Sequence, residues 1–303
     1  MTYAIDADRL TKTYGRHTVL DAVSLRVEQG EVFALLGPNG AGKTTTIGIL
    51  STLVAPDSGS ARVAGFDVER ERTEVTRRIA LTGQFAAVDD VLTGRENLVM
   101  IGRLRGLGRT AAKERATQLL ERFGLESAGG RRVATYSGGM RRRLDLALSF
   151  VTTPDVLFLD EPTTGLDTHH RRELWDVIRS LADAGVTVLL TTQYLEEADE
   201  LADRIAVLDD GRVVAEGTPE QLKARAGQVR VQLRDPAGTV LADAPTDGAL
   251  SGIRTVLAQW ESDGLSGDVA VRRPTLDDVF HTLTGRRSPE GTDTVPASTK
   301  ELA

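Results

Sequence analysis

The residues best suited to chemistry begin with a glycine-rich segment that precedes a predicted helix. This segment reads Gly37-Pro38-Asn39-Gly40-Ala41-Gly42-Lys43-Thr44 and fits the phosphate-loop pattern G-x-x-x-x-G-K-[ST]. Glycines let backbone N–H groups surround phosphate oxygens, and the helix directs its positive end to the same place. In such loops the lysine contacts the β- and γ-phosphates, and the next hydroxyl is a Mg²⁺ ligand. The predicted nucleotide-binding residues are Gly37, Pro38, Asn39, Gly40, Ala41, Gly42, Lys43, Thr44 and Thr45.

Two adjacent carboxylates, Asp160 and Glu161, follow the apolar run from Val156 to Leu159. Such a run predicts a strand buried on both faces, and the strand brings both acids to the edge of the sheet where ligands bind. There Asp160 would hold Mg²⁺, directly or through water, and Glu161 would be the general base for attack of water on the γ-phosphate. Taken alone, an acidic pair more often caps a loop, but the phosphate loop in the same chain favours the catalytic interpretation.

A third element, Tyr136-Ser137-Gly138-Gly139-Met140-Arg141, predicts a second site for an anion. Ser137 is a good helix N-cap, and Gly138 and Gly139 would expose backbone N–H groups at the start of the helix. An ordinary glycine-containing helix start remains the alternative for this motif taken by itself.

Strands that alternate with helices must position these residues. The pattern predicts a mostly parallel sheet covered by helices on both faces, with the phosphate loop directly after a buried strand. Strands are expected at residues 4–10, 19–27, 32–36, 156–159, 186–190, 205–208 and 212–216, and helices at 43–53, 88–124, 137–148 and 168–184.

The composition changes near Gly227, where a smaller unit begins. Its pattern of strand (229–233), helix (248–260), strand (269–271) and helix (275–283) predicts an α+β unit. Residues 286–303 are rich in Pro, Ser, Thr, Gly and Glu, which is typical of a disordered tail. We therefore expect an ATPase domain at 1–226, a small α+β domain at 227–285, and a tail at 286–303.

Together, the phosphate loop, the Ser137-Gly138-Gly139 element and the Asp160-Glu161 pair resemble the ATP-binding-cassette (ABC) family. The resemblance covers roughly residues 4–225. It implies an α/β fold, the P-loop NTPase of the ABC ATPase type, with a parallel-sheet core, an antiparallel β subdomain and a helical subdomain. It also implies a head-to-tail homodimer, in which Ser137-Gly138-Gly139, the signature motif, closes over ATP held by the other copy. The family usually has Gly-Gln at the end of this motif, whereas this chain has Gly139-Met140.

Three further positions match the family pattern. Tyr14 resembles the aromatic residue that stacks on adenine, although it could be an ordinary strand tyrosine. Gln84 resembles the glutamine that contacts Mg²⁺ and the attacking water and reports to the membrane domain; a lone glutamine is usually a polar loop residue. Asp167, in Gly165-Leu166-Asp167, resembles the loop that links the two ATP sites, and would otherwise be a helix N-cap.

One position departs from the family pattern. Gln193 follows a predicted strand where the family usually has a histidine that contacts the γ-phosphate. A glutamine amide can donate a hydrogen bond to phosphate, but it carries no charge and does not titrate. We therefore expect Gln193 to take part in catalysis and the chain to turn over ATP slowly.

The resemblance narrows to the daunorubicin/doxorubicin-resistance ATP-binding subunits, on the evidence of three segments. These are Tyr136 to Asp145, Thr191 to Asp199, and Leu276-Asp277-Asp278-Val279-Phe280. The last could equally be an ordinary amphipathic helix. In those relatives the ATPase energises a separate integral membrane permease that exports a drug or natural product. The resemblance thus implies peripheral attachment to the cytoplasmic side of the cell membrane, with ATP, Mg²⁺ and a permease as partners.

Composition limits the alternatives. The net charge of −7 and the pI of about 5.3 disfavour a nucleic-acid partner, and the chain has no cysteine for a disulfide or thiolate site. No apolar run approaches the roughly 20 residues that cross a bilayer, so a membrane role would work through a partner. Export of lipid or polysaccharide, and a regulatory ATPase with weakened hydrolysis, remain open. A cassette that acts on DNA or ribosomes fits poorly, because this chain has one phosphate loop and no long insertion.

Overall fold

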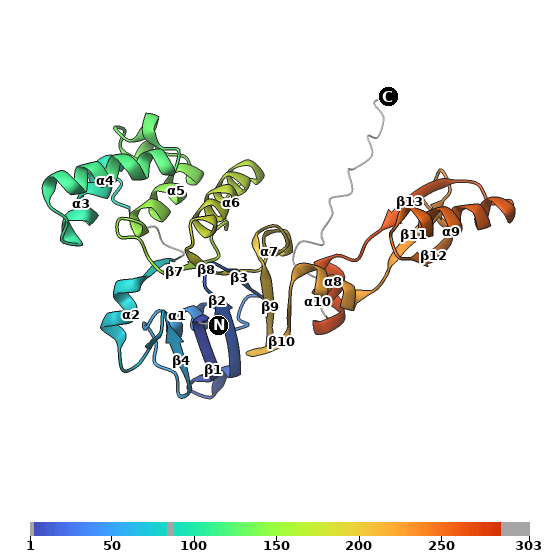
Figure 1. Ribbon diagram of the computed structural model, residues 1–303, viewed down its shortest axis with the longest axis horizontal. Coiled ribbons are helices and arrows are strands. Elements are labelled where there is room, and N and C mark those ends of the chain that lie inside the picture. The colour runs from blue at the N-terminus through green and yellow to red at the C-terminus, as the bar shows by residue number, and fades with distance from the viewer. Residues whose placement is uncertain (1–2, 84–87, 286–303) are drawn as a thin grey trace, which may run out of the picture. The chain divides into compact units, whose positions relative to one another are not determined.

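The computed structural model describes residues 3–83 and 88–285 and divides into two compact units, Met1–Glu216 and Gly217–Ala303 (Figure 1). None of the helices in these ranges is long and apolar enough to cross a membrane. The first unit contains all the described residues of the predicted ATP site.

A six-stranded sheet forms the centre of the first unit, in the order β10-β9-β3-β8-β7-β6. Strand β3 lies in parallel between β8 and β9, and β7 lies in parallel between β6 and β8. Every residue of β3, β7 and β8 is buried, which explains their continuous apolar sequences. The strands are β3 (Val32–Leu36), β6 (Ile79–Thr82), β7 (Val156–Asp160), β8 (Thr187–Thr192), β9 (Arg204–Asp209) and β10 (Arg212–Gly217).

An antiparallel sheet, in the order β2-β1-β4-β5, shares a hydrophobic core with one face of the central sheet. Its strands are β1 (Tyr3–Tyr14), β2 (His17–Glu28), β4 (Ser58–Val63) and β5 (Phe66–Asp67). Leu10 and Leu20 from this sheet belong to the same core as Phe33 of β3 and Ile47 of helix α1 (Lys43–Leu50). The phosphate loop therefore leads into a helix that is held between the two sheets.

Three further helices of the first unit lie together and form its helical part (Figure 1). They are α3 (Gly94–Leu104), α4 (Arg109–Arg122) and α5 (Gly138–Ser149). The single helical stretch expected at 88–124 is wrong: α3 and α4 are separate helices. Gly106, with φ +91°, breaks the helix between them. A capping box of Thr93 and Glu96 starts α3. The other helices are α2 (Arg72–Arg78), α6 (Thr168–Asp183) and α7 (Leu195–Leu201).

Up to residue 285, the second unit consists of a three-stranded antiparallel sheet and three helices. Its elements are α8 (Pro219–Ala226), β11 (Val229–Arg234), β12 (Val240–Thr246), α9 (Leu250–Ser262), β13 (Asp268–Arg272) and α10 (Leu276–Thr284). The sheet has the order β12-β11-β13, and Val231, Leu233 and Trp260 form its core. Helix α8 packs against α10 within this unit. The domain boundary at residue 226 stays a prediction, and the predicted tail at 286–303 lies outside the described residues.

Candidate active site

The phosphate loop occupies the turn between β3 and α1, and close packing requires glycine at two of its positions, Gly37 and Gly42. A Cβ atom at Gly37 would lie 2.2 Å from the backbone oxygen of Leu208. Gly42 has φ +106°, and a Cβ there would lie 2.5 Å from the side chain of Leu20. The N–H of Gly37 donates to the carbonyl of Thr192 at 3.1 Å, so the loop is attached to the end of β8. These contacts fix the turn on which the predicted nucleotide site depends.

Lys43 is buried inside the loop, with 4% of its surface exposed. Its Nζ donates to the carbonyls of Gly37 at 2.8 Å and Pro38 at 3.1 Å, and forms an ion pair with Glu161 Oε1 at 3.3 Å. Burial lowers the pKa of Lys43, while the negative charges of Glu161 and Asp160 act in the opposite direction. The cation is thus held where an entering phosphate would meet it.

Asp160 ends β7 and is also buried, with 5% exposure. Its Oδ1 accepts hydrogen bonds from Thr44 Oγ1 at 3.2 Å and from Thr191 Oγ1 at 2.6 Å. The parallel sheet brings β7 and β8 side by side, and Thr44 of α1 reaches the end of β7 through its hydrogen bond to Asp160. The two predicted Mg²⁺ ligands in the described chain, Thr44 and Asp160, therefore lie within hydrogen-bonding distance of each other.

Glu161 has an unusual backbone conformation, with φ +49°. A non-glycine residue in the left-handed region persists only where its surroundings hold it. Here its N–H donates to both the carbonyl and the Oγ1 of Thr191, each at 3.1 Å. Thr164 Oγ1 adds a donor 3.4 Å from Oε2. This strained turn directs the carboxylate back toward Lys43.

The signature motif begins α5 as the sequence indicates. Ser137 is the N-cap, and its Oγ accepts from the N–H of Met140 at 3.2 Å. Ser137 and Gly138 are exposed, whereas Gly139 is buried. A Cβ at Gly139 would lie 2.3 Å from the ring of His170, so α6 requires glycine there. Among the described residues, no hydrogen bond joins this motif to the phosphate loop of the same chain.

Asp167 is the N-cap of α6. Its carboxylate accepts from the N–H of His170 at 3.0 Å and contacts His170 Nδ1 at 2.6 Å. These hydrogen bonds lower the pKa of Asp167, with the backbone N–H as the main cause. The capping geometry agrees with the simpler expectation for this residue, and it leaves the predicted role in linking two ATP sites as a proposal.

Among the described residues, no hydrogen bond or ion pair joins Tyr14 or Gln193 to this cluster, and a third predicted residue is not described. Tyr14 ends β1 with 51% of its surface exposed, and the Nζ of Lys12 lies 5.6 Å from its ring centroid. Gln193 directly follows β8 and is partly buried. Gln84 lies outside the described residues, although Gly83 before it is described.

Comparison with known proteins identifies the family. A profile described as ABC transporter matches residues 20–164. A daunorubicin/doxorubicin resistance ATP-binding protein of Streptomyces peucetius is 46% identical over 325 residues, covering 100% of this chain and 98% of that protein. A daunorubicin resistance ATP-binding protein of Streptomyces coeruleorubidus is 52% identical over 305 residues, covering 93% and 96%.

The chain belongs to the ABC transporter family. A Nod factor export ATP-binding protein of Paraburkholderia xenovorans (strain LB400) is 41% identical over 296 residues, covering 93% of this chain and 97% of that protein. Among solved structures, an ATP-binding subunit of an ABC transporter matches with a TM-score of 0.65 and 29% identity, covering 74% of this chain and 93% of that chain. A dimeric ABC cassette bound to ADP and phosphate matches with a TM-score of 0.64 and 25% identity, covering 71% and 98%.

The predicted fold class is thereby confirmed, and the chain is an ATP-binding subunit with the ATPase activity of its family. The sheet order, the antiparallel β part and the helical part all match the expected ABC architecture. The small α+β extension is also present as the second unit.

Arg142 is a residue of this ABC site that sequence reasoning missed. Its Nε donates to the carbonyl of Pro162 at 2.9 Å, and its Nη1 donates to the carbonyl of Gly83 at 2.8 Å. Pro162 directly follows Glu161, and Gly83 directly precedes Gln84. One guanidinium of the signature helix thus binds the backbone next to two predicted catalytic residues, Glu161 and Gln84. The sequence shows three consecutive arginines, and no local pattern distinguishes the one that binds these carbonyls.

Glu197 is a second missed residue, completely buried on α7. Its Oε1 accepts from Trp175 Nε1 of α6 at 3.2 Å. Burial raises the pKa of Glu197, and its polar neighbours Thr192, Thr163 and Trp175 oppose the shift. Thr192 ends β8 and Thr163 follows the Glu161 turn, so this carboxyl lies directly behind the active site.

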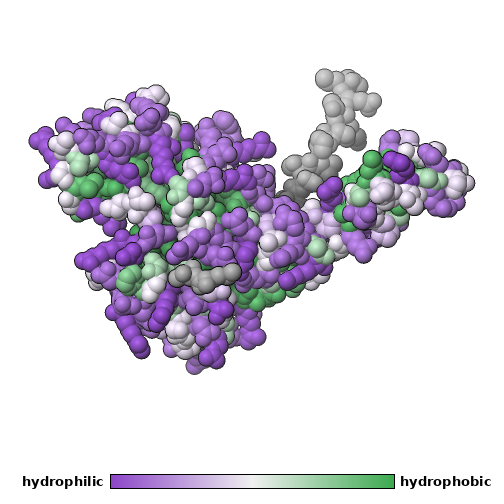
Figure 2. All heavy atoms as spheres, in the orientation of Figure 1, coloured by the Kyte–Doolittle hydropathy of each residue, from purple (hydrophilic) through white to green (hydrophobic). Residues whose placement is uncertain are grey.

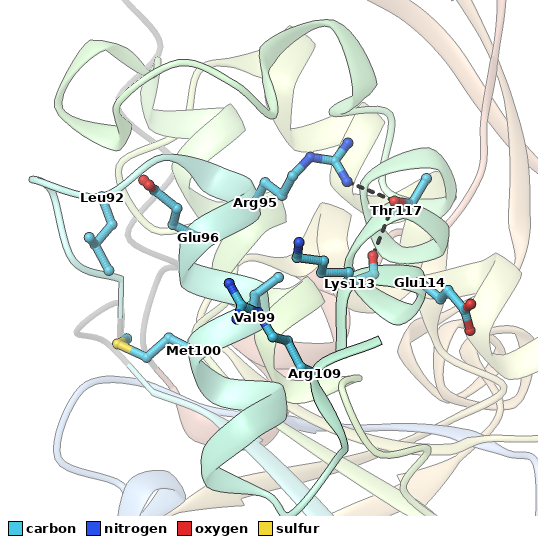
Figure 3. Close-up of a pocket in the computed structure, with 9 residues that line it drawn as sticks. All are labelled: Leu92, Arg95, Glu96, Val99, Met100, Arg109, Lys113, Glu114 and Thr117. Carbon is cyan, nitrogen blue, oxygen red and sulfur yellow. Dashed lines mark hydrogen bonds between the residues drawn. The ribbon is translucent and has the colours of Figure 1, made fainter. Parts of the chain in front are cut away.

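A hollow of about 760 Å³ lies between α3 and α4, apart from the ATP site (Figure 3). Apolar side chains from α3 line it together with charged groups, and Arg95 Nη1 donates to Thr117 Oγ1 at 2.7 Å across it. The lining residues are Leu92, Arg95, Glu96, Val99, Met100, Arg109, Lys113, Glu114 and Thr117. Leu104, at the end of α3, is 76% exposed.

Proposed function

We propose that this chain hydrolyses ATP to power export of a drug or natural product through a separate membrane permease, on the cytoplasmic side of the membrane. The observation that carries this proposal is the full-length similarity to daunorubicin-resistance proteins, at 46% to 52% identity. That similarity extends through the second unit, beyond the residues that the general ABC profile matches. A relative of 41% identity is named for Nod factor export, which supports a product other than daunorubicin; export of a lipid or polysaccharide is the second candidate.

The chemistry of the site fits Mg²⁺. Thr44 Oγ1 and Asp160 Oδ1 are hard oxygen donors 3.2 Å apart, the ligand type that Mg²⁺ prefers. Thr44 and Asp160, with Gln84 by resemblance, would hold the ion together with ATP phosphates. When bound, Mg²⁺ neutralises phosphate charge and orients the triphosphate.

The Lys43–Glu161 ion pair supports a proposed order of events. Entering phosphates compete with Glu161 for the Lys43 ammonium, since both are anions within reach of one cation. Once Lys43 binds phosphate, the Glu161 carboxylate is free to accept a proton from the attacking water. Gln193 would donate its amide N–H to the γ-phosphate, and Tyr14 would stack on adenine.

Dimerisation completes the proposed site. Ser137 and Gly138 are exposed at the N-terminus of α5, where backbone N–H groups and the helix dipole favour an anion. Without a hydrogen bond to their own phosphate loop, these groups suit ATP held by a second copy. Asp167 would then lie at the contact between the two sites, and hydrolysis would release the dimer.

The hollow between α3 and α4 supports a contact with the permease. It combines apolar side chains with Arg95, Lys113 and Glu114, a mixture that suits a short amphipathic helix (Figure 3). The segment from Val88 to Arg105 therefore remains our proposal for the path by which movement at Gln84 reaches the permease.

Steady-state ATPase activity with Mg²⁺ tests the catalytic proposal, using the parent, Lys43→Ala and Glu161→Gln. We expect both variants to lose activity by at least about a hundredfold, because one loses phosphate binding and the other the general base. Glu261→Gln, on the exposed face of α9, is the matched carboxylate control and should be unaffected.

Drug transport needs a separate assay with the chain and a permease in membrane vesicles. We expect ATP-dependent daunorubicin accumulation in inverted vesicles, and none with Glu161→Gln. Transport of a saccharide or lipid product without daunorubicin transport would favour the second candidate instead.

A further inference from the structure

The two edge strands of the sheet in the second unit differ in their ability to pair with a further strand. At one edge, β12 contains Pro245, which has no N–H, and Asp243. At the other edge, β13 reads Asp268-Val269-Ala270-Val271-Arg272 and contains neither proline nor lysine. Among the residues that the structure describes, β13 pairs only with β11. Proline within an edge strand prevents it from pairing, so β12 is protected at Pro245, whereas β13 has an uninterrupted apolar centre and carries charges only at its two ends.

The apolar face of the sheet continues to this open edge. Val269 pairs with Leu233, and Val271 pairs with Val231, so these side chains share the face on which the core lies. Helix α9 packs toward β12 and leaves Val269 and Val271 49% and 43% exposed. Figure 2 shows hydrophobic residues, in green, on the surface of this unit. The hydrophobic core is therefore incomplete on the β13 side.

The sequence of β13 is complementary to itself in the antiparallel direction. With Ala270 at the centre, Asp268 lies opposite Arg272 of a second copy, and Val269 lies opposite Val271. A twofold axis through Ala270 repeats both pairs, which gives two Asp–Arg and two Val–Val contacts. The same operation on β12 about Asp243 would oppose two carboxylates. Arg272 already donates to Asp278 at 2.9 Å, but its side chain is 60% exposed and its remaining donors can bind a second carboxylate.

We propose that β13 pairs antiparallel with β13 of a second copy, and that this contact holds two chains together without nucleotide. Two three-stranded sheets become one six-stranded sheet, and the exposed valines are buried against each other. The two ATPase units then remain at high local concentration, so that ATP-driven closure becomes intramolecular. The proposal is independent of the head-to-tail ATP dimer, which uses residues of the first unit.

Cysteine cross-linking of the full-length chain tests this pairing directly, because the chain contains no cysteine. Ala270→Cys would face itself across the twofold axis, whereas Leu241→Cys, on the exposed surface of β12, is the matched control. Both are made in the Lys43→Ala background and treated with a short bismaleimide without ATP. We expect covalent dimers with Ala270→Cys at least about tenfold faster than with Leu241→Cys. Equal rates for the two cysteine variants overturn the proposal. So does cross-linking of Ala270→Cys that occurs only when Lys43 is retained and ATP is added.

Charge exchange provides a second test, measured by sedimentation without nucleotide. Asp268→Arg alone and Arg272→Asp alone each oppose like charges at both ends of the pairing. We expect each to weaken dimerisation by about tenfold. A mixture of the two variants restores opposite charges at both ends and should dimerise as the parent does. If Asp268→Arg dimerises as the parent does, β13 pairing is contradicted. It is also contradicted if both variants melt at the parent's temperature and yet their mixture does not dimerise.

Discussion

At the scale of single residues, the active site is held by polar groups that bind backbone atoms. The carbonyl and the hydroxyl of Thr191 both accept from the N–H of Glu161. The same hydroxyl donates to the carboxylate of Asp160. Arg142 donates to the carbonyls of Pro162 and Gly83, which adjoin the predicted catalytic residues Glu161 and Gln84. The carboxylates are therefore positioned by β8 and by the signature helix as well as by their own strand.

Arg142 offers a test of positioning. We expect Arg142→Lys and Arg142→Met to lower kcat by about tenfold or more and to leave KM for ATP within about twofold, since a displaced loop costs rate more than affinity. Arg143→Gln removes the same charge from the same helix, where the guanidinium pairs with Glu173, and should have a smaller effect. If Arg143→Gln lowers kcat as much as the Arg142 variants do, or if the Arg142 variants change only KM, then Arg142 does not position Glu161.

Gln193 offers a test of its unusual identity. We expect Gln193→Ala to slow hydrolysis by about tenfold because a donor to the γ-phosphate is lost. Gln193→His should be more active than Gln193→Ala. Its rate should also depend on pH near the imidazole pKa, whereas the glutamine of the parent does not titrate. Rates measured from pH 6 to pH 8 (about the range in which imidazole titrates) check this. An alanine variant as fast as the parent removes Gln193 from the mechanism.

At the scale of elements, close approach of α5 and α6 depends on Gly139. We expect Gly139→Ala to lower the free energy of unfolding by roughly 1–3 kcal/mol, because its Cβ would overlap the His170 ring and disturb the Asp167 cap. Gly138→Ala is the matched control: its Cβ would have only an ordinary contact, 3.8 Å from Leu166. Denaturant unfolding of both variants makes the comparison, and equal stability would refute the packing argument.

The packing of α7 on α6 has a pH dependence through Glu197. Because burial raises its pKa in the folded state, the folded chain favours the protonated form. Its contribution to stability is therefore greatest below the ordinary glutamate pKa and is lost as pH rises through the folded-state pKa. Glu197→Gln keeps an acceptor for Trp175 without a charge. We expect the melting temperature of Glu197→Gln to rise relative to the parent between about pH 4.5 and neutrality, and a constant difference would exclude this cause.

At the scale of the whole molecule, two separate contacts would hold two copies together. We expect Glu161→Gln to bind ATP and accumulate the closed head-to-tail dimer, because hydrolysis no longer releases it. To isolate this contact, the variant also carries Asp268→Arg, which weakens the proposed β13 pairing. ATP should then convert monomer to dimer in sedimentation, and Lys43→Ala in place of Glu161→Gln should abolish that change. Persistence of monomer at saturating ATP would sink the head-to-tail scheme.

The organisation into elements was only partly predictable. The buried strands at 32–36, 156–160 and 187–192 are plain in the sequence because burial on both faces demands continuous apolar runs. Sequence patterns predict none of β4, β5, α2 and β6, and they also miss β12, whose small and polar residues include a proline. The break between α3 and α4 was also missed, because the apolar spacing continues past Gly106.

By itself the sequence determined the phosphate loop, the Asp160-Glu161 pair and the signature helix start, because each is built from neighbours in the chain. The family membership followed from those motifs. Only the tertiary structure decided that Arg142 joins two loops, that Thr191 supports both carboxylates, that Glu197 is buried, and that β13 is an open edge. Burial of a polar group, and the exposure of a strand, depend on contacts between segments far apart in sequence, and local patterns carry no record of those contacts.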